Sequence, residues 1–369
     1  MWYKWILFSL FSAWLPGSGG RNNVESVVAR QGVPVAESNV ADSIAMKGLF
    51  KMVLNDPAAA RGIVRARLGY SASGLPVDAW YFPGTSNERA LIIGGMHGSE
   101  LSSITLAEKL ITALQAGEPS YYSVVVVPAL FPDNAAAAAG LPQQIGSMQN
   151  IGRYSYRGAT DPNRQMPSPG RAFDAATGLD HLGRAIETEN EFLLELIQEF
   201  RPTRIANLHA IRDLDRGGIY ADPRTDHHGI ALGFESDSLL AIKMALAAWE
   251  AGGAMKGNGL PEQANTIYYR DPAAVPAGQW QPRNFTGSFG KQRRGSGVSM
   301  GTWGSTAIAL ETNAELNRPA MRVITIEFPG SKRPEDYLKT TDRDRCARQL
   351  DAFVTALKKV FLADGITDI

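Results

Sequence analysis

Residues 90–100 read Ala-Leu-Ile-Ile-Gly-Gly-Met-His-Gly-Ser-Glu, and the organisation of the chain can be worked out from this stretch. The apolar run at 90–93 has the length and composition of a buried strand, and the two glycines after it end that strand. His97 and Glu100 follow in the turn, three positions apart. Open α/β sheets carry their binding sites at the carboxyl ends of their strands, so this imidazole and this carboxylate lie where a site is expected.

Two later apolar runs also end in side chains that bind metals or move protons. The run Arg-Ile-Ala-Asn-Leu-His ends at His209, and the run Val-Ile-Thr-Ile-Glu ends at Glu327. A catalytic zinc site uses three protein ligands and keeps one position open for water. The sequence therefore predicts one zinc ion held by His97, Glu100 and His209. Glu327 is then left as a separate general base.

Strand and helix patterns alternate along the chain. Apolar runs typical of strands lie at 77–82, 90–95, 122–128, 204–208, 217–221 and 322–328. Helical periodicity covers 101–114, 182–200, 238–252 and 343–362. This alternation predicts an α/β fold with a mixed, mostly parallel central sheet and helices on both faces.

Two stretches, 134–181 and 253–304, are rich in loop-forming residues. Loops this long within a compact domain are usually functional or disordered. We expect the insertion at 253–304 to be a lid or specificity loop over the site. An insertion without a role in recognition is the alternative.

Composition excludes several classes of protein. The 369 residues contain 37 Lys and Arg and 37 Asp and Glu, a neutral balance that argues against a nucleic-acid binder. Cys346 is the single cysteine, which rules out an intramolecular disulfide and a multi-cysteine zinc site. The motifs span most of the chain, so we expect one catalytic domain over residues 66–369.

The first 20 residues have the shape of a secretory signal peptide: a lysine, an apolar stretch, then proline and small residues. A core or amphipathic helix is the alternative. The apolar stretch is too short to cross a bilayer, and no other segment predicts a stable membrane span. We therefore expect a periplasmic or secreted protein, with a cytoplasmic one as the alternative. Residues 21–65 are interpreted as an N-terminal extension.

Five motifs occur in a fixed order: a strand pair from 68 to 77, the segment 94–100, the turn Phe-Pro-Asp-Asn at 131–134, the arginine- and asparagine-containing segment 153–164, and Ile-Glu-Phe-Pro at 326–329. In this order they resemble the zinc metallocarboxypeptidases, and most of all the bacterial murein peptide amidases. Those amidases cut the bond between γ-D-glutamate and meso-diaminopimelate. The resemblance covers about residues 68–357. The segment 153–164 departs from the family pattern by one extra residue and by Pro in place of Leu.

The resemblance implies roles for four more residues. Asp161 matches the carboxylate that accepts the far N–H of the first histidine ligand. Arg153 matches the arginine that polarises the scissile carbonyl. Asn163 and Arg164 match the pair that grips the terminal carboxylate of the substrate. The alternatives are a turn-starting aspartate and solvated loop arginines.

Glu327 has a competitor as general base. Glu311 also ends a strand-like run, but residues 305–316 equally fit a helix that would make it a surface acid. Glu327 is followed by Phe-Pro, as in the family, and by a final helix. The family also uses a mobile tyrosine, for which Tyr268 and Tyr269 are equal candidates.

The resemblance implies zinc-dependent hydrolysis of a C-terminal peptide or amide bond, with murein peptides as the expected substrates. The partner would be a peptide with a free C-terminal carboxylate. One alternative is a zinc-dependent N-acyl amino acid deacylase of the succinylglutamate desuccinylase or aspartoacylase type. Another is a non-catalytic peptide-binding module on the same fold. A second polar cluster occurs in the sequence, for which a solvated turn is the favoured interpretation and a second metal site is the alternative: Asp222, Asp226, His227 and His228.

Overall fold

The computed structural model describes residues 36–37, 62–147, 150–155, 160–233, 235–260 and 297–364. Its strands are β1 (Ala36–Glu37), β2 (Val64–Tyr70), β3 (Pro76–Phe82), β4 (Arg89–Ile93), β5 (Ser123–Val127), β6 (Arg204–Ile211), β7 (Gly218–Ala221) and β8 (Arg322–Pro329). Its helices are α2 (Leu101–Gln115), α3 (Pro132–Gly140), α4 (Thr188–Phe200), α5 (Glu235–Glu250), α7 (Met300–Gly304) and α8 (Thr340–Ala356), the last continued by a π-helical turn (Leu357–Phe361).

The strands form one mixed sheet in the order β1-β2-β3-β5-β4-β6-β8-β7. Strands β5, β4, β6 and β8 run parallel at its centre, whereas β2, β3 and β7 make antiparallel pairs nearer the edges. The parallel strands put their carboxyl ends at one edge of the sheet, as the sequence predicts for the site.

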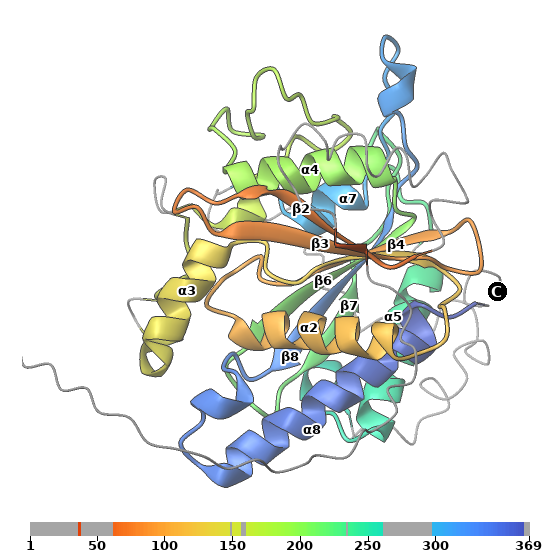
Figure 1. The fold of residues 1–369 in the computed structure, drawn as a ribbon. Helices are drawn as coiled ribbons and strands as arrows, with labels where there is room; N and C mark the ends of the chain where they lie inside the picture. The colour runs from red at the N-terminus through yellow and green to blue at the C-terminus, as the bar shows by residue number, and fades with distance from the viewer. Residues whose placement is uncertain are drawn as a thin grey trace, which may run out of the picture. The chain divides into compact units, whose positions relative to one another are not determined.

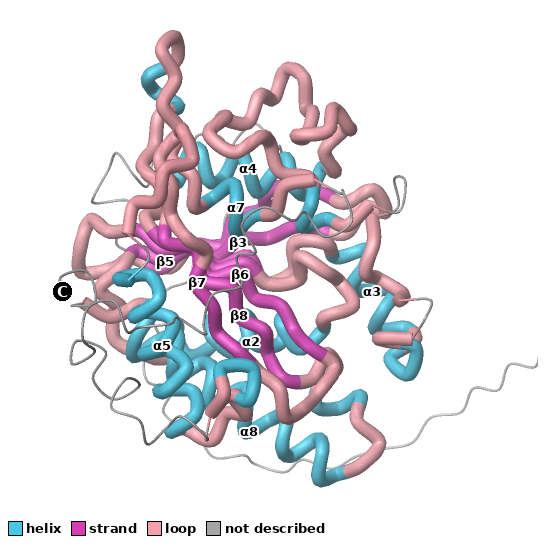
Figure 2. Tube along the Cα trace, turned by 180° about the vertical axis from the view of Figure 1, so that it is seen from behind, coloured by secondary structure: helices cyan, strands magenta, loops and turns pink. Residues whose placement is uncertain are grey.

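Helices cover both faces of the sheet, which confirms the predicted layers (Figure 1). Helices α4 and α7 lie on one face, and α2, α5 and α8 lie on the other, an arrangement also visible from behind in Figure 2. Alternate residues of a strand face opposite sides, so Val323 of β8 enters the core under α4 while Ile324 enters the core under α8. Among the described residues, no helix is both long enough and apolar enough to cross a membrane.

Two helix predictions differ from the structure. Residues 132–140, part of which was predicted to be loop, form α3, because Pro132 suits the first turn of a helix and five alanines follow. Helix α4 begins at Thr188 rather than at 182, because the residues before it form a tight turn in which Leu179 bridges Ala185.

The alternative helix at 305–316 is also wrong. Helix α7 ends at Gly304, and Ile308 then pairs with Arg318 as an isolated bridge. Glu311 lies in the exposed loop between them, so the interpretation of this residue as a surface acid is confirmed.

Several predictions fall outside the described residues. These are the signal peptide at 1–20, most of the extension at 21–65, residues 156–159 of the segment 153–164, and residues 261–296 of the insertion, which contain Tyr268 and Tyr269. Strand β1 lies within the predicted extension and β2 starts at Val64, so the sheet includes both β1 and the last two residues of that extension.

Candidate metal centre

The turn after β4 places His97 and Glu100 at the carboxyl end of that strand. Gly95 has a φ of +65°, which residues with a side chain rarely adopt. A Cβ at Gly98 would lie 2.3 Å from the backbone nitrogen of Ala135, so only glycine lets the turn pack this closely against α3. Because the turn is tight, both His97 and Glu100 are buried, at 3% and 4% exposure.

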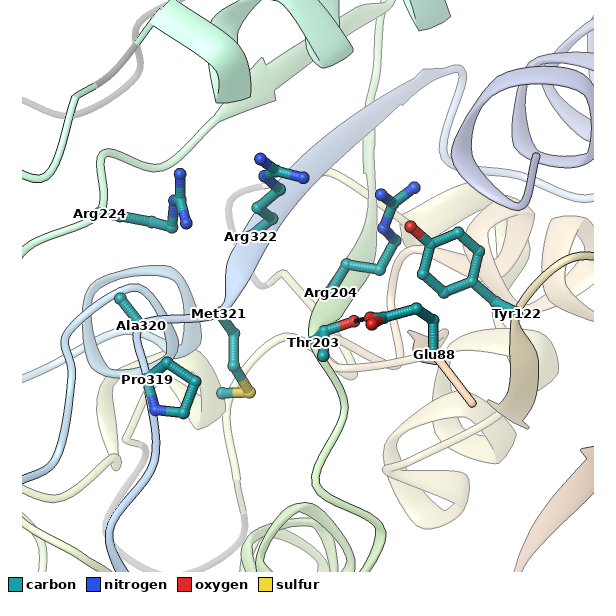
Figure 3. Close-up of a pocket in the computed structure, with 9 residues that line it drawn as sticks. All are labelled: Glu88, Tyr122, Thr203, Arg204, Arg224, Pro319, Ala320, Met321 and Arg322. Atoms are coloured by element: carbon teal, nitrogen blue, oxygen red, sulfur yellow. Dashed lines mark hydrogen bonds between the residues drawn. The ribbon is translucent and has the colours of Figure 1, made fainter. Parts of the chain in front are cut away.

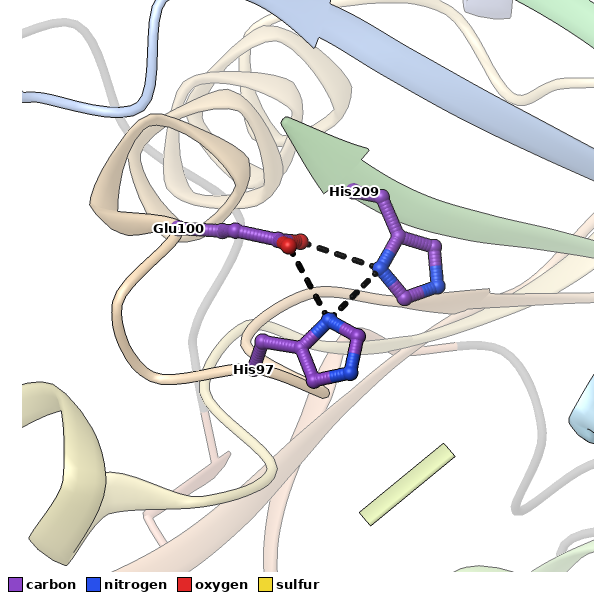
Figure 4. A group of neighbouring side chains, drawn as sticks. All are labelled: His97, Glu100 and His209. Atoms are coloured by element: carbon purple, nitrogen blue, oxygen red, sulfur yellow. Dashed lines mark hydrogen bonds and ion pairs between the residues drawn. The ribbon is translucent and has the colours of Figure 1, made fainter. Parts of the chain in front are cut away.

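Three buried side chains from distant parts of the sequence converge at this edge (Figure 4). The Nδ1 atom of His97 lies 3.0 Å from Oε1 of Glu100, and the Nδ1 atom of His209 lies 3.0 Å from Oε2. The two Nδ1 atoms are 3.1 Å apart. Zinc accepts imidazole nitrogens and a carboxylate in such a cluster, so His97, Glu100 and His209 could hold one metal ion.

Asp161 lies behind the cluster on the far side of the His97 ring. Its Oδ1 atom is 2.8 Å from Nε2 of His97 and also accepts the backbone N–H of Asn163 at 2.9 Å. A carboxylate at Nε2 holds the proton there and leaves Nδ1 free to face the cluster. The extra residue in the segment 153–164 therefore does not move Asp161 away from His97.

The charges of the cluster favour a cation. Burial alone would lower the pKa of His97, but Glu100 and Asp161 outweigh it and hold that pKa at about 9. Burial would raise the pKa of Glu100, yet the two imidazoles keep it well below its ordinary value. A metal ion would take the place of the proton that these carboxylates otherwise hold on His97.

Glu327 lies beside the cluster on the neighbouring strand. His209 of β6 and Glu327 of β8 are register partners, so their side chains leave the sheet next to each other on the same face. Burial raises the pKa of Glu327 above its ordinary value, and the two histidines and Arg153 only partly offset this. A carboxylate with a raised pKa next to a metal ion is suited to accept a proton from water. Glu311, by contrast, is exposed in a loop and is not on a strand next to a proposed ligand.

Arg153 contacts the cluster directly. Its guanidinium donates to Oε1 of Glu100 at 2.5 Å, and a second nitrogen lies 3.7 Å from Oδ2 of Asp161. The side chain is 30% exposed. It therefore lies where it can reach both the cluster and a molecule bound over it.

Asn163 and Arg164 occupy a short 3-10 helix (Pro162–Arg164) beside the cluster. The Asn163 amide lies 3.3 Å from Nε2 of His209, and its Oδ1 accepts the backbone N–H of Met300 at 2.9 Å. Arg164 donates to the backbone carbonyl of Asn163 at 2.6 Å and is half-buried. The structure thus brings together the predicted site residues that it describes, whereas the candidate tyrosines Tyr268 and Tyr269 lie outside the described residues.

Two polar residues that the sequence analysis did not identify lie next to the cluster, further back along β6 and β8. Asn207 and Thr325 are register partners, each two residues before His209 or Glu327, and so they share the same face of the sheet. Asn207 is 1% exposed, and neither atom of its side-chain amide has a hydrogen-bond partner among the described residues. Buried amides are nearly always paired, so this one needs an explanation. The period of two along each strand was the signal that could have identified both residues.

Asp222, the residue after the end of β7, lies on this same polar face. Its Oδ2 accepts the Thr325 hydroxyl at 3.1 Å, and a Cβ at Gly301 of α7 would lie 2.5 Å from its carboxylate, so this glycine makes room for it. Burial raises the pKa of Asp222 to about 6, and His209 and Arg164 are near enough to offset this in part. Within the described ranges, no basic side chain forms an ion pair with it.

The structure separates Asp222 from the other members of the second polar cluster. His227 and His228 lie in an exposed turn that begins at Asp226, whose Oδ1 accepts the backbone N–H groups of His228 and Ile230 at 2.8 Å. These residues fit the interpretation as a solvated turn, and Asp222 does not belong to it.

No protein-family model and no curated protein sequence matches the chain. Solved structures resemble it at low identity. A provisionally assigned carboxypeptidase A from Shewanella denitrificans OS-217 shares 16% identity over 85% of this chain and 67% of its own, with a TM-score of 0.45. The carboxypeptidase A from Helicoverpa armigera shares 12% identity over 89% and 74%, with a TM-score of 0.43. A metallo-carboxypeptidase from Burkholderia cenocepacia shares 14% identity over 86% and 68%, with a TM-score of 0.41.

Proposed function

We propose that this protein is a zinc-dependent hydrolase that releases the C-terminal residue of a peptide. The observation that carries the proposal is the buried His97, Glu100 and His209 cluster with Glu327 beside it. Two imidazoles, one carboxylate ligand and a second carboxylate poised for proton transfer form the set that hydrolysis of an amide needs. The donor atoms fit zinc, which would lower the pKa of a water molecule and polarise the carbonyl.

The residues around the cluster have complementary tasks. Glu327 would take a proton from the attacking water and return it to the leaving amine. Arg153 would stabilise the negative charge that develops on the carbonyl oxygen. Asp161 would keep His97 in the tautomer that leaves Nδ1 free.

Asn163 and Arg164 would hold the terminal carboxylate of the substrate. A guanidinium binds a carboxylate through two parallel hydrogen bonds, and the amide of Asn163 adds a donor beside it. With the carboxylate held there, the amide bond of the last residue would lie over the cluster. Cleavage would then occur one residue from the C-terminus.

The polar side chains of Asn207, Asp222 and Thr325, next to the cluster, support a proposal for the C-terminal residue of the substrate. Asp222 contacts Thr325, which is two residues or about 7 Å along β8 from Glu327. The carboxylate of Asp222 suits an ammonium group, and the unpaired amide of Asn207 suits a carboxylate. The side chain of diaminopimelate ends in both groups. A murein peptide ending in diaminopimelate is therefore the substrate that we propose, and export to the periplasm would bring the protein to it.

Mass spectrometry of reaction products tests the proposed function. We expect zinc-loaded protein to release diaminopimelate from L-Ala-γ-D-Glu-diaminopimelate, and a chelator to stop the release. N-succinyl-glutamate serves as the second substrate. Release of succinate instead would make the protein a deacylase and contradict the proposed reaction. Intact peptides after incubation, despite bound zinc, would favour the binding-module alternative.

The Asp222→Asn variant tests the proposed contact with the substrate ammonium. We compare kcat/KM for the diaminopimelate peptide with kcat/KM for the same peptide ending in 2-aminopimelate, which lacks the amine. Because a hydrogen bond to a charged group is worth about 1.5–3 kcal/mol, the variant should lose roughly tenfold or more of the preference for the amine.

The same preference should depend on pH in the unaltered protein. The pKa of Asp222 is about 6, so its charge is present above that pH and is lost as the pH falls below it. We expect the preference for the amine to fall below about pH 6 in the unaltered protein and to stay constant in Asp222→Asn. Equal preference in the two proteins at pH 8 would rule out this role for Asp222.

A further inference from the structure

A pocket lies at the amino ends of β6 and β8, whereas the metal centre lies toward their carboxyl ends. Figure 3 shows the residues that line it. It has a volume of about 240 Å³. Arg204 and Arg322 are register partners at the starts of β6 and β8, while His209 and Glu327 are partners five residues further on. At about 3.3 Å per residue, the pocket is about 16 Å from the metal centre along the same two strands.

Three arginines and one acid, Glu88, line this pocket, and a second acid, the buried Asp237, pairs with two of the arginines. Arg224 and Arg322 each direct Nε to the buried carboxylate of Asp237, at 2.7 and 2.9 Å. Both oxygens of Asp237 are therefore occupied by Nε atoms. Across the part of the chain that the structure describes, the terminal nitrogens of Arg322 have no hydrogen-bond acceptor.

Arg204 is the most unusual of the three. It is 1% exposed, donates to the backbone carbonyl of Phe361 at 2.6 Å, and stacks 4.0 Å from the centre of the Tyr122 ring. No described carboxylate lies within ion-pair distance of it. Burial lowers its pKa to about 10, because its charge is only partly compensated. A buried charge is costly unless it is paired, so this guanidinium lacks a counter-ion.

The other residues that line the pocket are an apolar wall and one carboxylate, and both affect how strongly the arginines attract an anion. Pro319, Ala320 and Met321 form an apolar wall, which strengthens electrostatic attraction inside the pocket. Glu88 lines the pocket too, and its Oε2 accepts the Thr203 hydroxyl at 2.8 Å. Three guanidinium groups against the carboxylates of Glu88 and Asp237 leave one positive charge in excess.

We propose that this pocket is a binding site for a small oxyanion, a phosphate or a carboxylate, held by Arg204 and by the terminal nitrogens of Arg322. Planar guanidinium groups bind both kinds of anion through paired hydrogen bonds. The anion would supply the counter-charge that Arg204 lacks. The site is independent of the proposed hydrolysis, because no residue of the metal centre lines it.

Isothermal titration of the full-length, zinc-loaded protein with inorganic phosphate, and separately with succinate, tests the site at constant ionic strength. We expect saturable binding of at least one of the two anions, and the one that binds identifies the class. Arg322→Gln should weaken this binding by about tenfold or more, because it removes a charged donor pair. Arg65→Gln, which removes an exposed arginine elsewhere, should leave it unchanged.

Two further variants keep the test decisive if Arg322→Gln folds poorly. Glu88→Gln removes the opposing carboxylate and should tighten binding several-fold. His209→Ala removes a ligand of the metal centre and should not change it, which separates this pocket from anion binding to zinc. The proposal is overturned if neither anion binds, if Glu88→Gln fails to tighten binding, or if His209→Ala abolishes it.

Discussion

The Glu327→Gln variant is expected to bind zinc normally and to lose nearly all turnover of the diaminopimelate peptide. Glutamine keeps the shape of the side chain but cannot accept a proton. General base catalysis contributes about a hundredfold to ten-thousandfold, so kcat should fall by that factor. The position of Glu327 next to His209 and its raised pKa are the physical reasons for the expectation. Product formation followed by mass spectrometry, with metal content measured on the same sample, gives both readouts.

Glu311→Gln is the matched control, because it makes the same chemical change at an exposed loop position. It should retain both zinc and turnover. Near-normal activity in Glu327→Gln would remove this residue from the mechanism. A loss of zinc along with activity would instead point to a structural role for Glu327 in the metal centre.

The second large effect is expected from His209→Ala, which should abolish stable metal binding and therefore all turnover. The variant leaves two of the three protein ligands that a catalytic zinc site uses. It also removes the stabilisation that the metal gives the folded state, about 2.7 kcal/mol when free metal is a hundred times Kd. In the unaltered protein a chelator should lower the melting temperature, and in His209→Ala it should have no effect.

His228→Ala is the control for this variant, since His228 is exposed in the turn that begins at Asp226 and is not one of the proposed ligands. It should keep one zinc per chain and the chelator-sensitive melting temperature. Full metal content in His209→Ala after dialysis would show that the ion is held elsewhere and would contradict the assignment.

The pattern of apolar runs was sufficient to predict the central strands and the strand ends at which the candidate site residues lie. A short apolar run that stops at a polar residue reflects a strand leaving the core, and the parallel arrangement brings such ends together. For that reason His97, Glu100, His209 and Glu327 could be named before their contacts were known. The start of α4 was harder, because the turn at 178–187 is held by contacts that the helical pattern does not contain.

The sequence by itself determined which metal-binding residue types follow the central strands, because residue types and their places after strands are local properties of the chain. Only the tertiary structure decided which polar residues lie together. Asn207, Asp222 and Thr325 meet because β6, β8 and β7 pair in one register, and a shift by one residue would turn Asn207 and Thr325 to the other face. The same register sets Arg204 beside Arg322 at the far end of those strands. Neighbourhoods of this kind depend on hydrogen bonds between strands more than a hundred residues apart, which no local pattern records.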